Sequence, residues 1–324
     1  MAEVYASVDL GGTKIGCALA TAGQRVIAER TITTDSHKGP EAVLERIAAL
    51  VNGLAADCGT SPAALGMGVP GLVDLERGVT KFLPNFPTQW RDVPVRERLE
   101  PRIGCPVYLL NDVRAATLGE LTFGHGRSVK TMAFFALGTG IGGGIVVDGV
   151  LRLGPLGAAG ELGHQTVLPD GPQCGCGNSG CLEAVASGPA VAAEGVRLLL
   201  SGQAPKLHEI AGGDSSRVTA KEMAAAAEAG DAAVREALIR AAGYLGIGVA
   251  NIVTALHPEL VVLGGGMADL GPLLFDTVRD TVRRRVRMFP VDDVRIEPSL
   301  LGEKAGLWGG IALAMRQGNL LATR

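Results

Sequence analysis

Four residues that could bind a metal ion lie close together in the sequence: His164, Cys174, Cys176 and Cys181. One imidazole and three thiolates are ligands that tetrahedral zinc prefers, and four protein ligands leave no open position for chemistry. The segment is rich in glycine, proline and asparagine, so it cannot build a hydrophobic core of its own. A disulfide or an unrelated group of thiols is the alternative. The close spacing favours a structural zinc that orders the loop.

Two carboxylates flank this cluster in the sequence. Glu161 precedes His164 by three positions, and Glu183 follows Cys181 by two. Ionised carboxylates bind sugar hydroxyl groups well through charge-assisted hydrogen bonds. A neutral imidazole has two nitrogens, so His164 could bind zinc through one and a hydroxyl group through the other. Each glutamate could equally be a solvated loop residue.

A glycine turn suited to phosphate binding lies near the N-terminus, in the sequence Asp9-Leu10-Gly11-Gly12-Thr13-Lys14. Glycines allow the backbone N–H groups to approach a phosphate closely, and the threonine adds a hydroxyl donor. The aspartate is placed to hold Mg²⁺ directly or through water. A plain hairpin turn is the alternative, and the flanking Asp and Thr-Lys favour phosphate binding.

A second glycine turn occupies residues 138–144, GTGIGGG. Its spacing matches the dinucleotide-binding fingerprint, but that fingerprint requires a helix directly afterwards. Strand-forming residues follow here at 145–147, which excludes the dinucleotide reading. We therefore expect a second phosphate-binding hairpin that includes Thr139 and Gly140. A third glycine run around Gly265 follows a strand, where either a nucleotide contact or an ordinary turn is expected.

Asp112 is the candidate catalytic base. It follows Asn111 directly after the predicted strand 107–110 and opens a predicted helix. The carboxyl ends of strands are where α/β proteins place their chemistry, and phosphoryl transfer needs a base that accepts the proton of the attacking hydroxyl. Asp112 could instead be a helix N-cap. Position 115 is alanine, so no capping box supports that alternative.

The alternation of strand and helix patterns predicts an α/β fold. Strands are expected at 4–10, 15–19, 65–69, 107–110 and 260–263, and helices at 41–56, 112–121, 221–256 and near the C-terminus. The last helix is expected to pack on the first half of the chain, and residues 201–220 to be a polar surface excursion. The two glycine hairpins resemble each other, which indicates two similar halves across a cleft, although coincidence is equally compatible.

Composition narrows the class of protein. The chain has 324 residues, 47% of them apolar, and a net charge of −3, so a basic surface for nucleic acid is not expected. The N-terminus lacks the pattern of a signal peptide, and polar residues and proline interrupt the most apolar windows at 131–150 and 241–264. Cys17, Cys58 and Cys105 are isolated in the sequence, and we expect them to be small core residues. A cytoplasmic protein is expected.

The motifs taken together resemble the ROK family of sugar kinases and repressors, and within it the bacterial glucokinases. The segments that carry the resemblance are DLGGTK (9–14), GVPGLVD (68–74), LPNFPTQW (83–90), LLND (109–112), LGTGIGGG to GELGH (137–164) and CGCGNSGCLE (174–183). The resemblance implies a two-domain actin-like ATPase (ribonuclease H-like) fold with a central cleft. We place the small α/β domain at 1–111 plus 302–324, and the large domain with the zinc loop at 112–301.

The resemblance also implies the site. Asp112 would be the base. Sugar ligands would be Asn85, Asn111, Asp112, Glu161, His164 and Glu183. Structural zinc would be held by His164, Cys174, Cys176 and Cys181. ATP and Mg²⁺ would lie near Asp9, Gly11, Gly12, Thr13, Lys14, Thr139, Gly140 and Gly265.

The function expected from these features is ATP-dependent phosphorylation of a hexose, with glucose to glucose 6-phosphate as the first choice. The alternative is a ROK kinase for mannose, fructose, N-acetylglucosamine or N-acetylmannosamine, because motifs do not resolve epimers. A sugar-responsive transcription regulator is a remote alternative, since only eight residues precede Asp9. Small-molecule partners, no nucleic acid, no membrane and a homodimer or homotetramer are expected.

Overall fold

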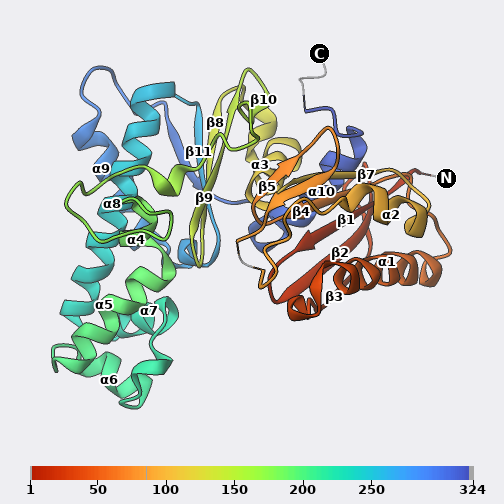
Figure 1. Cartoon of the computed structure of the whole chain (residues 1–324). Helices are drawn as coiled ribbons and strands as arrows, with labels where there is room; N and C mark the ends of the chain where they lie inside the picture. Colours follow the sequence, from red (N-terminus) through yellow and green to blue (C-terminus); the bar gives the residue numbers. More distant parts are fainter. Residues whose placement is uncertain (1, 85, 321–324) are drawn as a thin grey trace. The chain divides into compact units, whose positions relative to one another are not determined.

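The structure is a computed structural model that describes residues 2–84 and 86–320. The chain forms two compact units, shown with their element labels in Figure 1. Unit 1 comprises residues 1–130, 144–160 and 299–324, and unit 2 comprises residues 131–143 and 161–298. Both units mix strands and helices, which confirms the predicted α/β class. Each unit is described separately below.

The main sheet of unit 1 has the strand order β3-β2-β1-β4-β7. Its strands are β1 (Val4–Leu10), β2 (Lys14–Thr21), β3 (Val26–Thr33), β4 (Leu65–Val69) and β7 (Val107–Asn111). Strands β1, β4 and β7 run parallel, while β2 and β3 add antiparallel hairpins at one edge. The carboxyl ends of β1, β4 and β7 therefore meet at the same edge of the sheet, where Asp9 pairs with Gly68 in register.

Helices cover both faces of this sheet, because the strands are apolar on both faces. The helices of unit 1 are α1 (Gly39–Asp57), α2 (Val95–Ile103), α3 (Asp112–Phe123) and α10 (Ala305–Met315). Ala6 and Val8 of β1 belong to the core cluster that contains the apolar face of α1. Ser7 points to the opposite face, since side chains alternate along a strand, and there it meets Gly310 of α10. The expected packing of the C-terminal helix on the first half is confirmed.

Helices α3 and α10 pack so closely that there is no room for side chains where their backbones meet. A Cβ atom on Gly119 of α3 would lie 2.5 Å from the carbonyl oxygen of Ala305, and a Cβ on Gly309 would overlap the carbonyl of Ala115. This close packing is the reason that α3 belongs to unit 1. The compact units thus group residues 112–130 differently from the expected division at residue 111.

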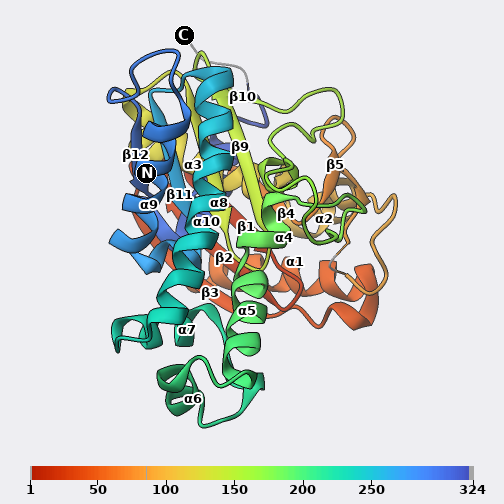
Figure 2. The same cartoon turned by 90° about the vertical axis from the view of Figure 1, so that its left-hand side faces the viewer.

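The second sheet has the order β10-β9-β8-β11-β12. Its strands are β8 (Met132–Leu137), β9 (Ile141–Val147), β10 (Val150–Arg152), β11 (Leu260–Gly264) and β12 (Arg295–Pro298). The helices of unit 2 are α4 (Leu182–Ala186), α5 (Gly188–Leu200), α6 (Pro205–Ala211), α7 (Ala220–Glu228), α8 (Ala232–Leu256) and α9 (Pro272–Arg285). Helix α6 lies at the end of α5 that is away from α4, and α7 packs beside α5 (Figures 1 and 2).

Shorter elements complete the fold. A two-stranded sheet in unit 1 is formed by β5 (Leu72–Asp74) and β6 (Val79–Phe82). Single 3₁₀ turns are η1 (Ser36–Lys38), η2 (His125–Ser128), η3 (Leu162–His164), η4 (Ser215–Arg217), η5 (Gly266–Leu270) and η6 (Gly302–Lys304).

Residues 201–220 are mostly exposed, as expected for a surface excursion, but the segment contains a helix, α6, that the sequence did not predict. The helix has no capping side chain of its own at its N-terminus. The buried carboxylate of Asp231 accepts hydrogen bonds from the backbone N–H groups of Lys206 (3.1 Å) and Leu207 (3.4 Å) instead. A distant residue therefore supplies the cap, and local sequence does not reveal it.

One helix in the described part of the chain, α8, is long and apolar enough to cross a membrane by length and composition alone. Just over half of its most apolar window, 56%, is buried inside the protein. In Figure 2 it is the long helix against which α9 packs. A core helix of a globular unit accounts for these properties, as the interrupted apolar pattern predicts.

Candidate active site

The four predicted zinc ligands come together in unit 2. The ligand atoms of His164, Cys174, Cys176 and Cys181 all lie within 4.8 Å of one another. Cys174 Sγ is 3.6 Å from His164 Nδ1, and Cys176 Sγ is 3.7 Å from Cys181 Sγ. Sulfur atoms about 2.3 Å from a tetrahedral zinc lie about 3.8 Å apart. The cluster is therefore close to the spacing of a tetrahedral zinc site, and no disulfide joins the three cysteines.

The imidazole of His164 has two distinct environments. Its Nδ1 atom faces Cys174 within the thiol cluster, and its Nε2 atom lies 4.0 Å from a carboxylate oxygen of Glu161. Both residues belong to the segment around η3, which brings them to one side of the loop. The ring nitrogen that does not face the thiols thus lies on the side of Glu161, where a hydroxyl group could contact both side chains.

Glu183 joins the zinc loop to the second glycine turn. One of its carboxylate oxygens accepts a hydrogen bond from the backbone N–H of Ile141 at 2.8 Å, and the other lies 3.8 Å from Cys174 Sγ. A Cβ atom at Gly140 would stand 2.5 Å from this carboxylate. A side chain at position 140 would therefore displace this carboxylate. The alternative that Glu183 is a solvated loop residue is wrong.

The second glycine turn opens onto a cavity of about 790 Å³ in unit 2. The turn connects β8 to β9, and the N–H of Gly138 bonds the carbonyl of Gly140 at 2.9 Å. Helix α5 braces the turn, because the N–H of Gly188 donates to the carbonyl of Gly138. The N–H groups of Thr139 and Gly140 have no acceptor among the described residues, so they can receive an anion.

The cavity wall combines the second glycine turn with helices α5 and α7 and the 3₁₀ turn η5. The lining residues are Gly138, Thr139, Gly188, Pro189, Ala192, Val218, Thr219, Ala220, Lys221, Ala224, Ala225, Glu228, Gly266, Met267, Asp269 and Leu270. Gly265 stands just behind this wall with a φ of 86°, and a Cβ there would overlap the carbonyl of Leu137. It therefore allows the end of β11 to lie against the end of β8.

The first glycine turn lies in unit 1, between β1 and β2. The N–H of Gly11 donates to the carbonyl of Lys14 at 2.9 Å, which closes the hairpin. Thr34 holds the turn from the side, through a hydroxyl bond to the carbonyl of Gly11 at 2.7 Å. The N–H groups of Gly12 and Thr13 have no acceptor within residues 2–84 and 86–320. The two hairpins thus present free N–H groups in the same way.

Asp9 and Asp112 lie side by side at the carboxyl edge of the unit 1 sheet. The space over Gly68 lies between them: a Cβ there would be 3.5 Å from Asp9 Oδ1 and 3.4 Å from the Cα of Asp112. Burial, and then the charge of Asp9, raises the pKa of Asp112 to about 6, although the N–H of Val113 opposes this shift. Burial also raises the pKa of Asp9.

Two partly buried carboxylates that lie so close repel each other, and the carboxylate of Asp9 has no hydrogen-bond partner among the described residues. A bound divalent cation would reduce the repulsion and would also coordinate the carboxylate of Asp9, so Asp9 is suited to be a Mg²⁺ ligand. Val113 N–H donates to Oδ1 of Asp112 at 2.8 Å, and no other residue in the described part of the chain donates to this carboxylate, so Oδ2 can accept a hydroxyl proton.

Asn111 is the N-cap of α3, so the alternative that Asp112 is the cap is wrong. The side-chain oxygen of Asn111 accepts from the N–H groups of Val113 (3.1 Å) and Arg114 (3.2 Å), and from Arg114 Nη1 (3.1 Å). Its amide nitrogen donates to the carbonyl of Gly71 at 3.2 Å. One amide hydrogen remains, so Asn111 can serve a sugar only as a donor.

The predicted sugar ligand Asn85 lies outside the described residues. The residues after it form a tight loop in which the rings of Phe86 and Trp90 pack at 5.1 Å, both buried. The hydroxyl of Thr80 donates to the carbonyl of Trp90 at 3.0 Å, which ties this loop to β6.

Comparison with known proteins decides the family. The chain matches the ROK family model over residues 5–317. It belongs to the ROK family. Among curated ROK relatives, a glucokinase of Thermotoga maritima is 37% identical over 309 residues, which cover 94% of this chain and 95% of the relative. The ROK xylose repressor of Caldicellulosiruptor bescii is 33% identical over 251 residues, covering 78% of this chain and 62% of the repressor.

A solved ROK structure is similar over nearly the whole chain. The crystal structure of a ROK family glucokinase from Streptomyces griseus in complex with glucose and AMPPNP has a TM-score of 0.83 and 33% identity. The match covers 97% of this chain and 99% of the neighbour. This ROK protein therefore has the actin-like ATPase fold of the ROK sugar kinases, as expected from the sequence.

The predicted site residues of this ROK protein divide between the two units. Asp9, the first glycine turn, Asn111 and Asp112 belong to unit 1, whereas Glu161, the zinc loop, Glu183 and the second glycine turn belong to unit 2. Two kinds of functional candidate were missed. Lys221 and Glu228 of α7 line the cavity, and no local motif marks them. Arg114 is buried beside Asn111, and its residue type alone predicts exposure.

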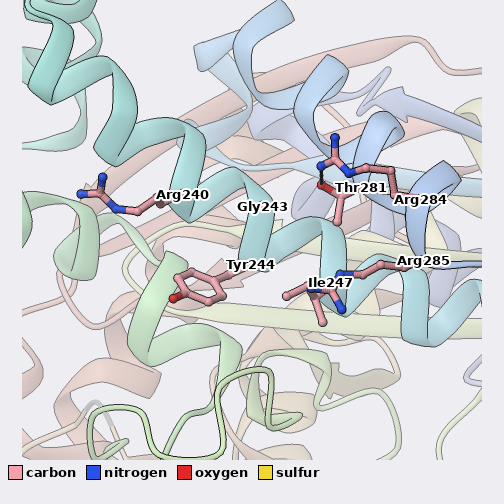
Figure 3. Close-up of a pocket in the computed structure, with 7 residues that line it drawn as sticks. All are labelled: Arg240, Gly243, Tyr244, Ile247, Thr281, Arg284 and Arg285. Carbon is pink, nitrogen blue, oxygen red and sulfur yellow. Dashed lines mark hydrogen bonds between the residues drawn. The ribbon is translucent and has the colours of Figure 1, made fainter.

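Another cavity of the ROK protein, of about 430 Å³, lies between α8 and α9 (Figure 3). Arg240, Tyr244, Ile247, Arg284 and Arg285 line it, with Gly243 and Thr281. Arginines in the last turn of a helix are favoured by the helix dipole, which accounts for those of α9. No predicted site residue lines this cavity, so it is separate from the candidate active site.

Proposed function

We propose that this ROK protein transfers the terminal phosphoryl group of ATP to the 6-hydroxyl of glucose. The observation that carries the proposal is the carboxylate of Asp112. It lies where the parallel strands β1, β4 and β7 end, with one oxygen that does not bond Val113 and with a pKa raised to about 6. A base with such a pKa is largely ionised at pH 7 and still accepts a proton readily. The glucokinase relatives support glucose as the acceptor.

The sugar hydroxyl groups would be held by both hydrogen-bond donors and hydrogen-bond acceptors. Asn111 contributes its one remaining amide hydrogen, while Glu161 and Glu183 contribute acceptor oxygens. His164 adds the ring nitrogen that does not face the thiols. Asn85 is included among the proposed ligands because of its place in the family motif. Asp112 would accept the proton of the hydroxyl group as its oxygen attacks the terminal phosphorus, and the bond from that phosphorus to ADP breaks.

The nucleotide would use the two glycine turns and the cavity of unit 2. Free N–H groups at Gly12, Thr13, Thr139 and Gly140 suit phosphate oxygens, and Lys14 adds a positive charge. The cavity of about 790 Å³, with its apolar wall, suits the base and ribose. Mg²⁺ near Asp9 would supply neutralisation of the phosphate charge.

Zinc would have a structural role. His164, Cys174, Cys176 and Cys181 supply four ligands at the spacing of a closed tetrahedron, which leaves no position for substrate. The ion would fix the loop that carries Glu183 and orient the imidazole of His164 toward the sugar.

The test is a coupled assay of ADP release with ATP and Mg²⁺ over a panel of sugars: glucose, mannose, fructose, N-acetylglucosamine and N-acetylmannosamine. We expect glucose to give the highest kcat/KM. A higher value with another sugar would reassign the acceptor while leaving the kinase chemistry intact. Release of ADP that does not depend on any sugar would contradict the proposal.

A sugar-responsive regulator is the second candidate, because the repressor named above is a ROK relative. The net charge of −3 does not favour binding to the phosphate backbone of nucleic acid. We therefore propose that no nucleic acid is bound. Binding of duplex DNA at moderate salt in a mobility-shift assay would revive this candidate.

We also propose a cytoplasmic location, where ATP and reduced thiols occur. We propose that the protein is a homodimer or homotetramer, which light scattering can test.

A further inference from the structure

The chain passes between the two units at four points. These points lie after Lys130, after Gly143, after Gly160 and after Pro298. On the unit 1 side, each of the four connecting segments is held by a side chain of α3. The same helix begins with Asp112, the proposed base. One helix therefore carries both the proposed base and the side chains that hold all four connecting segments. The other buried positions of this helix are occupied by small and apolar residues.

Glu120 holds two of the connecting segments. One carboxylate oxygen accepts from the N–H of His125 at 3.3 Å, in the turn that leads to the first passage. The other oxygen accepts from the hydroxyl of Ser299 and from the N–H of Leu301 at 3.0 Å, directly after the fourth passage. Glu120 is fully buried, and a Cβ on Gly124 would overlap its carboxylate.

Thr117 holds the segment after the second passage. A Cβ atom on Gly144, the first residue of that segment in unit 1, would overlap the side chain of Thr117. The hydroxyl of Thr117 donates to the carbonyl of Val113 at 2.8 Å, so the side chain is fixed in place. The strand backbone therefore lies directly against the helix at this point.

Arg114 holds the segment before the third passage. Its guanidinium donates from Nε to the carbonyl of Ala159 at 3.1 Å, and from Nη2 to the carbonyl of Ala158 at 3.2 Å. A third bond runs from Nη1 to the side chain of Asn111 at 3.1 Å. Arg114 therefore links a connecting segment directly to the proposed sugar ligand beside the base.

The three residues are spaced by three along α3, so they share one face of the helix. All three are buried. Burying a guanidinium and a carboxylate is costly unless every polar group is bonded, and apolar residues would stabilise the helix at lower cost. Directional bonds, however, define the position of a backbone more narrowly than apolar packing does.

We infer that Arg114, Thr117 and Glu120 are positioning residues that fix the four connecting segments to the helix carrying Asp112. They hold the unit 1 ends of the four connections in place with respect to the base. The inference rests on the proposed role of Asp112. Because sugar and nucleotide ligands are divided between the units, binding of one ligand then alters the affinity for the other through these segments.

The test is Glu120→Gln, which keeps the size of the side chain but places an amide NH₂ opposite one of the bonded donors. The matched control is Asp231→Asn. Asp231 is also a buried carboxylate that accepts three backbone N–H groups, from Lys206, Leu207 and Val234, but it lies within unit 2 and away from the passages. Comparison of the two variants separates positioning from a general loss of stability.

The measured quantity is the factor by which glucose changes the Kd of AMPPNP, determined by calorimetry without turnover. We expect a factor of about ten in the wild type. Glu120→Gln should bring the factor to within about twofold of one and lower kcat at least about tenfold, while Asp231→Asn should keep both near wild type. A coupling factor unchanged in Glu120→Gln would overturn the inference.

Hydrogen exchange of the ligand-free protein gives an independent readout. Amides in residues 124–131 and 299–302 should exchange faster in Glu120→Gln, and at wild-type rates in Asp231→Asn. If Glu120→Gln does not fold, Ser299→Ala removes one donor to the same carboxylate and takes its place. Wild-type exchange in these segments would refute the anchoring itself. Absence of glucose phosphorylation with intact coupling would instead refute the proposed function alone.

Discussion

Replacing Asp112 with asparagine should stabilise the protein while abolishing its activity. The pKa of Asp112 is raised from 3.8 to about 6, chiefly by burial and then by the charge of Asp9. The folded state therefore binds a proton more tightly than the unfolded state. Above pH 6 the ionised carboxylate costs folding free energy, at about 1.4 kcal/mol for each unit of pKa. The cost at pH 7 is about 3 kcal/mol, and Asp112→Asn removes it.

Because the pKa of Asp112 is raised in the folded state, the cost in folding free energy depends on pH. As the pH falls through 6, the folded protein takes up the proton and the cost declines, to about 1.5 kcal/mol at pH 5 and close to zero near pH 4. The stability gained by Asp112→Asn should shrink in the same way. Asparagine still accepts the hydrogen bond from Val113 N–H, so this contact is not lost.

The assay is urea unfolding followed by tryptophan fluorescence, without nucleotide or Mg²⁺. The two tryptophans of the chain, Trp90 and Trp308, both belong to unit 1, which also contains Asp112. Their fluorescence therefore reports the unit in which the change is made. Turnover should fall about 10²- to 10⁴-fold, the range for loss of a general base, with glucose binding largely retained.

The control is Asp92→Asn, since Lys81 lowers the pKa of Asp92 and its loss should bring no gain in stability. The reasoning is refuted if Asp112→Asn is no more stable than the wild type at pH 7, or if its gain is the same at pH 5 and pH 7. Near-normal turnover would remove Asp112 from the role of base.

Three further predictions concern the same site. The kcat/KM for glucose should fall about tenfold per pH unit below an apparent pKa near 6, because Asp112 must be ionised; a flat profile between pH 5 and 7 would contradict this. Cys176→Ser should lower bound zinc, measured by elemental analysis, together with activity; full activity without zinc would argue against a structural ion. Gly140→Ala should raise the KM for ATP about tenfold, because its Cβ displaces Glu183, which holds the second glycine turn through the N–H of Ile141. Gly243→Ala, with open space around it, should behave as wild type.

Local chemistry explains which parts of the site could be predicted. Zinc ligands are recognisable because residue type and spacing alone nearly define the site, as with Cys174 and Cys176. The strands and the glycine hairpins follow from alternation and from turn residues. The choice between base and N-cap at Asp112 could not be made from sequence, because Asn111 and Asp112 are both good capping residues. It depends on which side chain turns back to the helix.

Features that depend on distant contacts could not be predicted. Helix α6 begins where it does because Asp231 reaches its N–H groups across a long stretch of sequence. The cavity wall formed by α7 consists largely of alanines that carry no chemical signal. The division into units differs from the expected one because glycines at positions 119 and 309 let α3 dock on α10, and glycine in a helix is not by itself a sign of close packing.

Helix α10 has a consequence for synthesis of the chain. It covers one face of β1, β4 and β7, yet it begins at Ala305, about 175 residues after unit 1 is first left at Lys130. At 5–20 residues per second, a ribosome takes roughly 10–35 s to supply it. During this interval the sheet carrying Asp9 lacks its cover, while nearly all of unit 2 emerges and can fold. The nascent chain therefore presents an apolar surface that favours chaperone capture until its last helix is released.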